Sequence, residues 1–282
     1  MLAGFGWFQT TLGAAQTKPA AAKKPASGAP KSPDAAAANQ VDLERVRADL
    51  ESGDEAKILG ALETVERTGD VRAAQLVEAL LKRGASVPVL KAAISAAGSL
   101  KQTSSSAAIS PYLQHRSPEV RRAAAKALIK TKGPTAVKAL RQGLRSSDAV
   151  VRGTAATGLG ELGAKEALAD LFGALDHYVG EAAASIGLLC GAADCDKLLA
   201  RVGRVPFQIM TSGLDQILFR REISDEQKIK VVAQVRELGT QDARVFLAEV
   251  LARWPKDASP RVRQALDAAV KAIGGAGRKQ GG

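Results

Sequence analysis

Aromatic residues, cysteines and long apolar runs are all scarce in this chain of 282 residues. Only 4% of its residues are aromatic and two are Cys, although 46% are hydrophobic. Alternating β-branched and aromatic residues joined by Asn-Gly or Asp-Gly turns, which hairpins require, are missing. The apolar content is mainly Ala, Leu and Val, and Ala and Leu are strong helix formers. The composition therefore predicts an all-α fold.

Two cysteines, Cys190 and Cys195, are too few for a disulfide framework. Cys190 lies in the apolar run IGLLCGAA, where we expect a small buried hydrophobic side chain. Cys195 is expected to begin the next helix. The C-x4-C spacing has no nearby His and no second pair, so it does not indicate a metal site. We expect neither a metal nor a cofactor.

No stretch of the sequence approaches the roughly 20 apolar residues that a membrane-spanning helix needs. Residues 1–16, MLAGFGWFQTTLGAAQ, form a short apolar segment that lacks the basic start of a standard secretory signal. We expect a cytoplasmic protein. Two alternatives stay open for this segment: a weak contact of Phe5, Trp7 and Phe8 with a membrane surface or a protein, and an atypical or truncated export signal.

Residues 17–40 are rich in Ala, Pro, Lys and Ser and have no apolar periodicity. Such a segment buries too little surface to offset the entropy of ordering, so we predict a disordered linker. Residues 274–282, GGAGRKQGG, are expected to be a disordered tail. The folded domain is therefore predicted over residues 41–273.

One phrase recurs along this domain. Residues 117–131 read SPEVRRAAAKALIKT and residues 259–273 read SPRVRQALDAAVKAI. A shift of 31 residues aligns Val120 with Val151, and the match continues through VVRGTAATGLGELG. Further copies begin at Ile58, Val89, Val179 and Val262. A nearly fixed period of this length is typical of a solenoid.

Each unit contains two amphipathic helices. In the first helix, Val120, Ala124 and Leu128 share one face. After a break near residues 132–133, TAVKALRQGLR forms the second helix. A single pair could not bury both of its apolar faces, whereas stacked pairs share a continuous core.

The units SPEVRRAAAKAL, VVRGTAATGLGELG and SPRVRQALDAAV resemble the HEAT-repeat family, in its short bacterial or PBS-lyase-type HEAT-like form. The resemblance covers most of residues 53–273. It implies an α-solenoid, a superhelix of about six to seven stacked antiparallel helix pairs. It also implies that the arginines after Val, Arg121 and Arg152, pair with acidic residues of neighbouring units. HEAT arrays share a shape and no single activity.

The repeat is irregular near residues 203–224, where the step of about 48 residues is too long for one unit. We predict an additional helix over about 208–221. Either an element is inserted there or the stacking phase changes. Its bulky side chains, Phe207, Met210 and Phe219, are expected to fill the gap, and a special binding face is the alternative.

Positive charge is concentrated in the middle of the chain. The net charge is +11, and residues 101–150 hold ten Lys and Arg against two acidic residues, whereas residues 151–200 hold three against seven. Arg122, Lys126 and Lys130 form a stripe at i, i+4 and i+8 on one helix. Lys138, Arg141 and Arg145 form a basic face on its partner helix. We identify these six residues as a candidate patch for an acidic protein partner, with solvated helix faces as the alternative.

No combination of residues indicates catalysis. His115 and His177 lie in inter-unit turns without a cluster of ligands around them, and the Gly residues of GLGELG follow no strand. Bilin lyases and alkylpurine DNA glycosylases are enzymes that resemble HEAT proteins. The glycosylases use aromatic residues in a basic groove, but this chain has only Trp7 and Trp254 as tryptophans.

The sequence thus predicts a non-catalytic protein–protein interaction scaffold or adaptor. We expect the second helices of the pairs to line its concave face. Nucleic-acid binding by the basic face of the central repeats is the alternative, although no aromatic residues interleave the basic ones to stack on bases. The sequence identifies neither the protein partner nor the oligomeric state.

Overall fold

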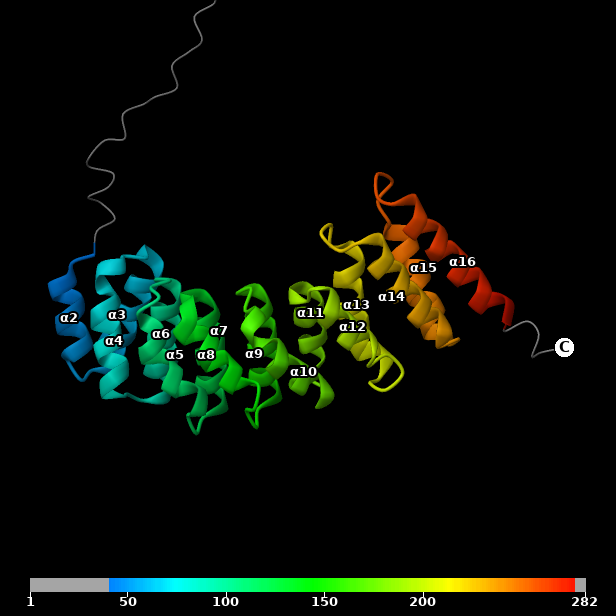
Figure 1. Cartoon of the computed structure of the whole chain (residues 1–282). Helices are drawn as coiled ribbons and strands as arrows, with labels where there is room; N and C mark the ends of the chain where they lie inside the picture. The colour runs from blue at the N-terminus through cyan, green and yellow to red at the C-terminus, as the bar shows by residue number, and fades with distance from the viewer. Residues whose placement is uncertain (1–40, 277–282) are drawn as a thin grey trace, which may run out of the picture. The chain divides into compact units, whose positions relative to one another are not determined.

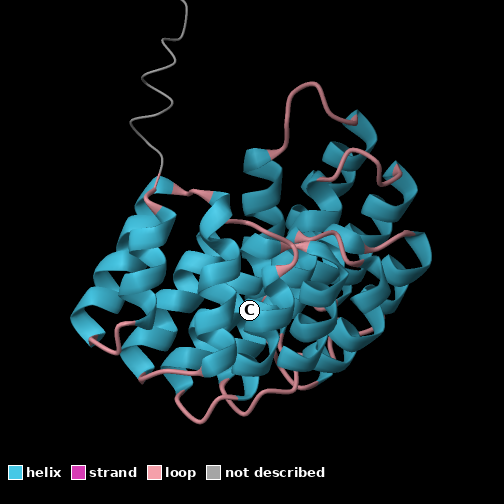
Figure 2. Ribbon diagram, turned by 90° about the vertical axis from the view of Figure 1, so that its left-hand side faces the viewer, coloured by secondary structure: helices cyan, strands magenta, loops and turns pink. Residues whose placement is uncertain are grey.

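The computed structural model describes residues 41–276, and within them the chain is helical. Fifteen α-helices and three short 3-10 helices account for the regular structure of this part. An isolated bridge between Val202 and Val205 is its only extended pairing, and Figure 2 shows helices and loops alone. The predicted all-α fold is confirmed. The expectations for residues 1–40 and 277–282 lie outside the described residues.

The helices follow one another along the stack in chain order (Figure 1). They are α2 (Leu43–Glu51), α3 (Glu55–Thr68), α4 (Ala74–Arg83), α5 (Val87–Ser99), α6 (Ser105–Ile109), α7 (Pro118–Thr131), α8 (Gly133–Gly143), α9 (Ala149–Glu161), α10 (Leu168–Asp176), α11 (Gly180–Leu189), α12 (Ala192–Leu199), α13 (Phe207–Phe219), α14 (Asp225–Glu237), α15 (Gln241–Arg253) and α16 (Pro260–Ala276). Helix α16 extends three residues past the predicted end of the domain, so residues 274–276 of the expected tail are helical.

Successive helices alternate between two layers as far as α13. Each odd-numbered helix contacts the next odd-numbered one, from α3 through to α13, and we call this set layer A. The even-numbered helices α2 to α12, which we call layer B, lie on the other side against their neighbours in the chain. The recurring phrase of the sequence forms the layer A helices α7 and α9.

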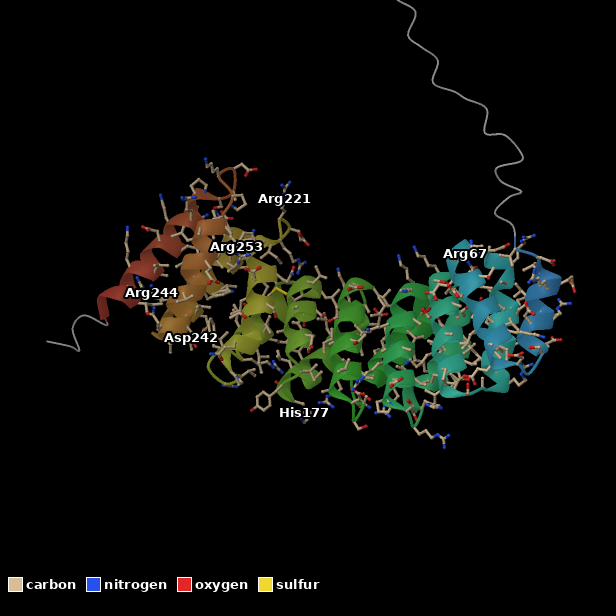
Figure 3. All side chains as sticks on the ribbon, turned by 180° about the vertical axis from the view of Figure 1, so that it is seen from behind. Arg67, His177, Arg221, Asp242, Arg244 and Arg253 are labelled. Carbon is tan, nitrogen blue, oxygen red and sulfur yellow. A yellow bond between two sulfur atoms is a disulfide. The ribbon has the colours of Figure 1, made fainter. Side chains whose placement is uncertain are left out.

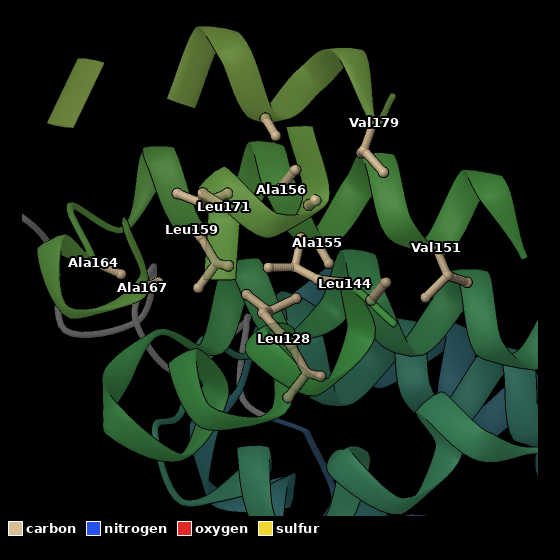
Figure 4. Packing of buried hydrophobic residues seen from close by; sticks show 14 of the residues in the cluster. Leu128, Leu144, Val151, Ala155, Ala156, Leu159, Ala164, Ala167, Leu171 and Val179 are labelled. Atoms are coloured by element: carbon tan, nitrogen blue, oxygen red, sulfur yellow. The ribbon is translucent and has the colours of Figure 1, made fainter. Parts of the chain in front are cut away.

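The repeat register is confirmed by burial. Val120, Val151, Ala124 and Ala155 are all fully buried. Figure 4 shows Ala155 and Ala156 among Leu128, Leu144, Leu159 and other apolar side chains of the shared core. Alanines occupy these positions because neighbouring layer A helices lie too close together for larger side chains.

Glycine permits the closest approaches in layer A. A Cβ atom added to Gly187 of α11 would lie 2.2 Å from the carbonyl oxygen of Gly213 in α13, and one added to Gly98 of α5 would lie 2.9 Å from the Cβ of Ala127 in α7. By contrast, Gly173 of α10 in layer B has no atom within 4 Å of such a position. These glycines let the backbones of neighbouring layer A helices come into close contact. Our expectation that the second helices line the concave face stays a prediction.

In α7 and α9, the arginine after the first buried valine holds the turn that precedes its own helix. Arg121 Nη1 donates to the carbonyl oxygens of His115 and Arg116 at 3.0 and 3.1 Å. Arg152 Nη1 donates in the same way to Ser146 and Ser147 at 2.8 and 3.2 Å. The acidic partner that the resemblance implied is found for Arg121, which lies 3.6 Å from Asp148. For Arg152 the turn carbonyls take the place of an acid.

The irregular join contains the additional helix that the sequence predicts. Helix α13 packs against α11 and so continues layer A. Met210 is fully buried, Phe207 packs edge-on against Phe246 of α15, and Phe219 packs against Trp254. The bulky residues therefore fill the join, as expected.

The extra helix also changes the stacking phase. Helix α14 packs against α12, where Gln227 Nε2 donates to Asp196 at 2.9 Å. Helix α15 packs against α13, and α16 packs against α14. The last copy of the repeated phrase, in α16, thus lies on the layer B side, whereas α7 and α9 lie in layer A. Both alternatives raised by the sequence hold, because the inserted helix is itself the cause of the phase change.

A disulfide joins Cys190 to Cys195 across the turn between α11 and α12. Both residues are buried, as expected for Cys190. The expectation of a plain small hydrophobic side chain is wrong, because a spacing of five residues across this turn brings the two Cα atoms to 5.3 Å. Arg220 Nη1 donates to the carbonyl oxygens of Gly187 and Cys190 at the same turn.

We expect Gly187→Ala to destabilise the protein, because its methyl group would meet the backbone of α13. Overpacking of this kind typically costs about 1–3 kcal/mol. Gly173→Ala in α10 is the matched control. Its added methyl group meets open space, and replacing Gly by Ala in a helix stabilises it by up to about 1 kcal/mol. Urea denaturation of both variants measures the difference, and equal stabilities would contradict the close packing of layer A.

Candidate functional site

The six basic residues identified from the sequence lie on two surfaces. Arg122, Lys126 and Lys130 are exposed on α7 in layer A. Lys138, Arg141 and Arg145 are exposed too, but they belong to the α8 region in layer B. Because α7 and α8 pack against each other, their exposed faces point to opposite sides of the stack. The structure therefore brings together the members of each set and separates the two sets.

In the α7 set, one cation is paired and two are free. Arg122 Nε lies 2.9 Å from a carboxylate oxygen of Asp148. Asp148 also accepts from the backbone N–H of Val150 at 2.9 Å and so caps α9. Lys126 and Lys130 have no ion pair within residues 41–276.

Burial of the Asp148 carboxyl would by itself raise its pKa. The hydrogen bonds from Arg122 and from the N–H of Val150 outweigh that effect, so the pKa of Asp148 lies below its ordinary value. Asp148 therefore remains a carboxylate at neutral pH and holds two neighbouring units together.

The α8 set surrounds one carboxylate. Arg141 Nε lies 2.6 Å from Asp170 of α10, and Arg145 Nη2 lies 3.4 Å from the other oxygen of the same carboxylate. Together with Lys138 and Gln142, these residues line a shallow depression of about 230 Å³. Two of the three cations are thus partly neutralised, and Lys138 has no ion pair in the described part of the chain.

A groove that sequence reasoning missed crosses the exposed face of layer A. It has a volume of about 580 Å³ and is lined by α9, α11 and α13. Leu188 and Ile209 give it an apolar floor, and Leu188 is 42% exposed. Its polar lining comprises Thr157, Glu161, Glu181, Ser185, Gln208, Ser212 and Gln216.

Part of this groove could have been found by reading across the repeats. The shift of 31 residues places Thr157 where α7 has Lys126, and Glu161 where α7 has Lys130. The exposed face of layer A therefore changes from basic on α7 to neutral and acidic on α9. The contribution of α13 could not be found in this way, because α13 lies outside the repeat.

The two histidines lie in inter-unit turns, as the sequence indicates. His115 precedes α7 and His177 precedes α11, at the edge of the stack where Figure 3 labels it. Within residues 41–276, no group of His, Cys, Asp and Glu side chains is arranged to hold a metal ion. No helix in this range combines the length and the apolar character that a membrane span needs.

The fold defines the described chain as an α-solenoid of stacked helix pairs. Residues 73–156, which extend from the start of α4 through most of α9, match the family model for HEAT repeats. This part of the chain therefore consists of HEAT repeats, and the resemblance seen in the sequence is confirmed.

Several known structures have a similar fold. The complex of CpcE and CpcF of phycocyanin lyase from Nostoc is 18% identical, with 90% of this chain and 100% of that chain covered and a TM-score of 0.46. A homology model of the full-length AP-3 complex is 16% identical over 88% of this chain and 54% of that chain, with a TM-score of 0.52. Human deoxyhypusine hydroxylase is 15% identical over 86% and 99% of the two chains, with a TM-score of 0.40. No curated protein matches the sequence.

These similarities show the repeat fold and leave the activity open. The names of two of these structures, a lyase and a hydroxylase, are those of enzymes. Designed armadillo repeat proteins are similar as well, and one of them is in complex with a peptide. HEAT-like folds share a shape and no single activity, so the fold alone does not assign one to this chain.

We expect Asp148→Ala to destabilise the protein by roughly 2–4 kcal/mol, because α9 loses its cap and Arg121 and Arg122 lose a carboxylate. Asp54→Ala is the control. Asp54 caps α3 by accepting from Ala56 and Lys57 but has no arginine partner, so about 0.5–2 kcal/mol is expected. Denaturant titration at neutral pH measures both, and equal losses would contradict the inter-unit role of Asp148.

The stability difference between wild type and Asp148→Ala should depend on pH. The pKa of Asp148 is lower in the folded state than in the unfolded chain, so its contribution is fully present above the unfolded value of about 4. It disappears as the pH falls through the lower folded value, and the gap between wild type and Asp148→Ala should narrow there.

Proposed function

We propose that this chain is a non-catalytic scaffold that binds a segment of a partner protein on the exposed face of layer A. One observation carries the proposal: the groove across α9, α11 and α13 lies on the same layer as α7, the neighbour of α9, where Lys126 and Lys130 are exposed and have no ion pair within residues 41–276. Thr157 in the groove lining occupies the same repeat position as Lys126. Neighbouring helices pack about 8–10 Å apart, so a short extended segment spans both features.

The chemistry of this face specifies the partner segment. The ammonium groups on α7 favour acidic side chains, and Leu188 and Ile209 favour an apolar side chain in the groove. The amides of Gln208 and Gln216 can both donate and accept hydrogen bonds, as an extended backbone requires. Leu188 of α11 lies two helix spacings from α7, a distance of about 16–20 Å that corresponds to about five or six extended residues. The segment should therefore carry acidic residues about five or six positions from an apolar one.

Lys138, Arg141 and Arg145 are proposed as a second, weaker contact. They face the layer B side, so they cannot bind the same short segment as Lys126 and Lys130. Asp170 already binds Arg141 and Arg145, which leaves Lys138 as the cation of this set most available to an acidic surface.

The arrangement favours a protein partner over nucleic acid. A duplex presents a continuous row of phosphates and needs a continuous basic surface. The two basic sets lie on opposite faces, and Glu161 of α9 and Glu181 of α11 line the groove that lies beyond α7 on layer A. Phosphates that followed the groove from α7 would meet these carboxylates.

Panning a random peptide library on the full chain tests the proposal, since the selection itself reveals which peptides bind. We expect selected peptides to carry Asp or Glu about five or six residues from an apolar residue. Lys126→Glu combined with Lys130→Glu should weaken their binding by at least about tenfold, because two attractive charges become repulsive.

The control combines Lys57→Glu on α3 with Lys82→Glu on α4, two exposed lysines whose reversal changes the net charge equally. This control should leave peptide binding unchanged. Equal weakening by both double variants, or selection of no common pattern, would reject the proposed surface. Binding of generic duplex DNA with a steep dependence on salt would support the nucleic-acid alternative instead.

The disulfide bears on the compartment in which the scaffold works. Disulfides persist in oxidising environments and are rare in the cytosol. The bond between Cys190 and Cys195 therefore supports export over the cytoplasmic location that we expected from the sequence.

Rapid alkylation of the denatured protein taken directly from its native cells checks this location. We expect no free thiols before reduction and two after it, because the chain has two cysteines. Complete alkylation before reduction would show that the pair is kept reduced in the cell and would restore the cytoplasmic expectation.

A further inference from the structure

A cavity of about 560 Å³ lies at the edge of the stack, away from the groove of layer A. It forms where the turn before α7 meets the turn between α8 and α9. Its lining includes Arg116, Arg121, Arg145 and His115 but no Asp or Glu. Three arginines from two stretches of the chain thus line one hollow.

The surroundings of this cavity do not neutralise its charge. Two carboxylates, Asp148 and Asp170, are the acidic partners of the arginines nearby. They are shared among Arg121, Arg122, Arg141 and Arg145, while Arg116 is exposed and has no ion pair within the described residues. Four guanidinium groups therefore share two carboxylates, and a fifth has none among the described residues. Arg145 is held at 3.4 Å with 83% of its side chain exposed, so it can turn to a ligand.

The cavity also offers hydrogen-bond donors in fixed positions. Arg121 is anchored through Nη1 to two turn carbonyls, which fixes the position of its guanidinium group in the cavity wall. His115 Nδ1 accepts from the backbone N–H of Ser117 at 3.1 Å, which places the proton of the neutral ring on Nε2. Ser146 Oγ accepts from the N–H of Asp148 at 3.2 Å, so its own hydroxyl proton is free to be donated.

We infer that this cavity binds a phosphoryl group. A phosphoryl group carries a charge of about −1.5 to −2 and three strong acceptor oxygens, which suits several cations arranged around one point. Guanidinium forks match its geometry closely. A carboxylate carries one charge and two coplanar oxygens, and so would leave more of these donors unused.

The next inter-unit turn provides an internal comparison. A cavity of about 590 Å³ there is lined by Arg145, Arg152 and His177, which makes it similar in size and position along the repeat. Its lining includes Asp170, however, and a carboxylate in the wall repels an anion. The inference is therefore confined to the cavity beside His115.

Titration of the full chain with inorganic phosphate, followed by calorimetry and by amide chemical shifts, tests the assignment. We expect saturable shifts for His115, Ser146 and Ser147 and little change at His177. Arg116→Gln combined with Arg145→Gln should weaken binding by at least about tenfold, because it removes two charge-assisted contacts. Both side chains are exposed, so the variant should fold normally.

Lys57→Gln combined with Lys82→Gln is the control, since it removes the same charge from exposed positions of α3 and α4 and should leave phosphate binding unchanged. Equal weakening by both variants would reduce the effect to general electrostatics and overturn the site. Acetate binding as strong as phosphate binding, or no saturable shift at His115, would overturn it as well. A phosphoserine peptide that binds more tightly than inorganic phosphate would identify the source as a modified protein, and equal binding would identify a free phosphate or a small ester. These results do not depend on the layer A groove, so either proposal can fail alone.

Discussion

The close approach of helices within layer A is the constraint on which the rest of this structure depends. Where the backbones of α11 and α13 come together at Gly187 and Gly213, no side chain fits between them. The same constraint accounts for the alanines of α7 and α9 and for the scarcity of aromatic residues, which concentrate at the irregular join instead. Small side chains on α9 and α11 also leave the outer face of this layer hollow. The small side chains that allow the helices of layer A to pack closely thus also leave room for the groove.

Charged residues of successive repeat units form ion pairs with one another. The basic excess of residues 101–150 and the acidic excess of residues 151–200 are partly complementary, because Arg141 and Arg145 of one unit bind Asp170 of the next. A similar contact joins Arg201 to Asp176 at 2.7 Å. Much of what looks like a binding patch in the sequence therefore stabilises the stack. The cations left over, such as Lys126, Lys130 and Lys138, are better candidates for a partner than the whole cluster.

Periodicity in the sequence reports which face of a helix is buried, and that was enough to predict the helix pairs, their register at Val120 and Val151, and the additional helix α13. It does not report which neighbour covers that face. For this reason, periodicity could not predict the separation of the α7 and α8 basic sets or the phase change. The contact between Cys190 and Cys195 depends on the shape of one turn, and the cavity beside His115 depends on two turns that are distant in sequence.

The phase change sets a limit on any binding surface. After α13, the repeated phrase is found in layer B, because α16, which carries it, packs against α14, and α14 packs against α12. The disulfide and Arg220 stabilise the turn at Cys190, between α11 and α12, which lies just before the inserted helix α13. The face of layer A that continues from α7 therefore reaches α13, beyond which α15 presents Asp242 and Arg253 in paired contacts with α13. A partner segment on this face is bounded at one end by the α7 cations and at the other by the inserted helix, which favours a short linear segment over a large folded surface.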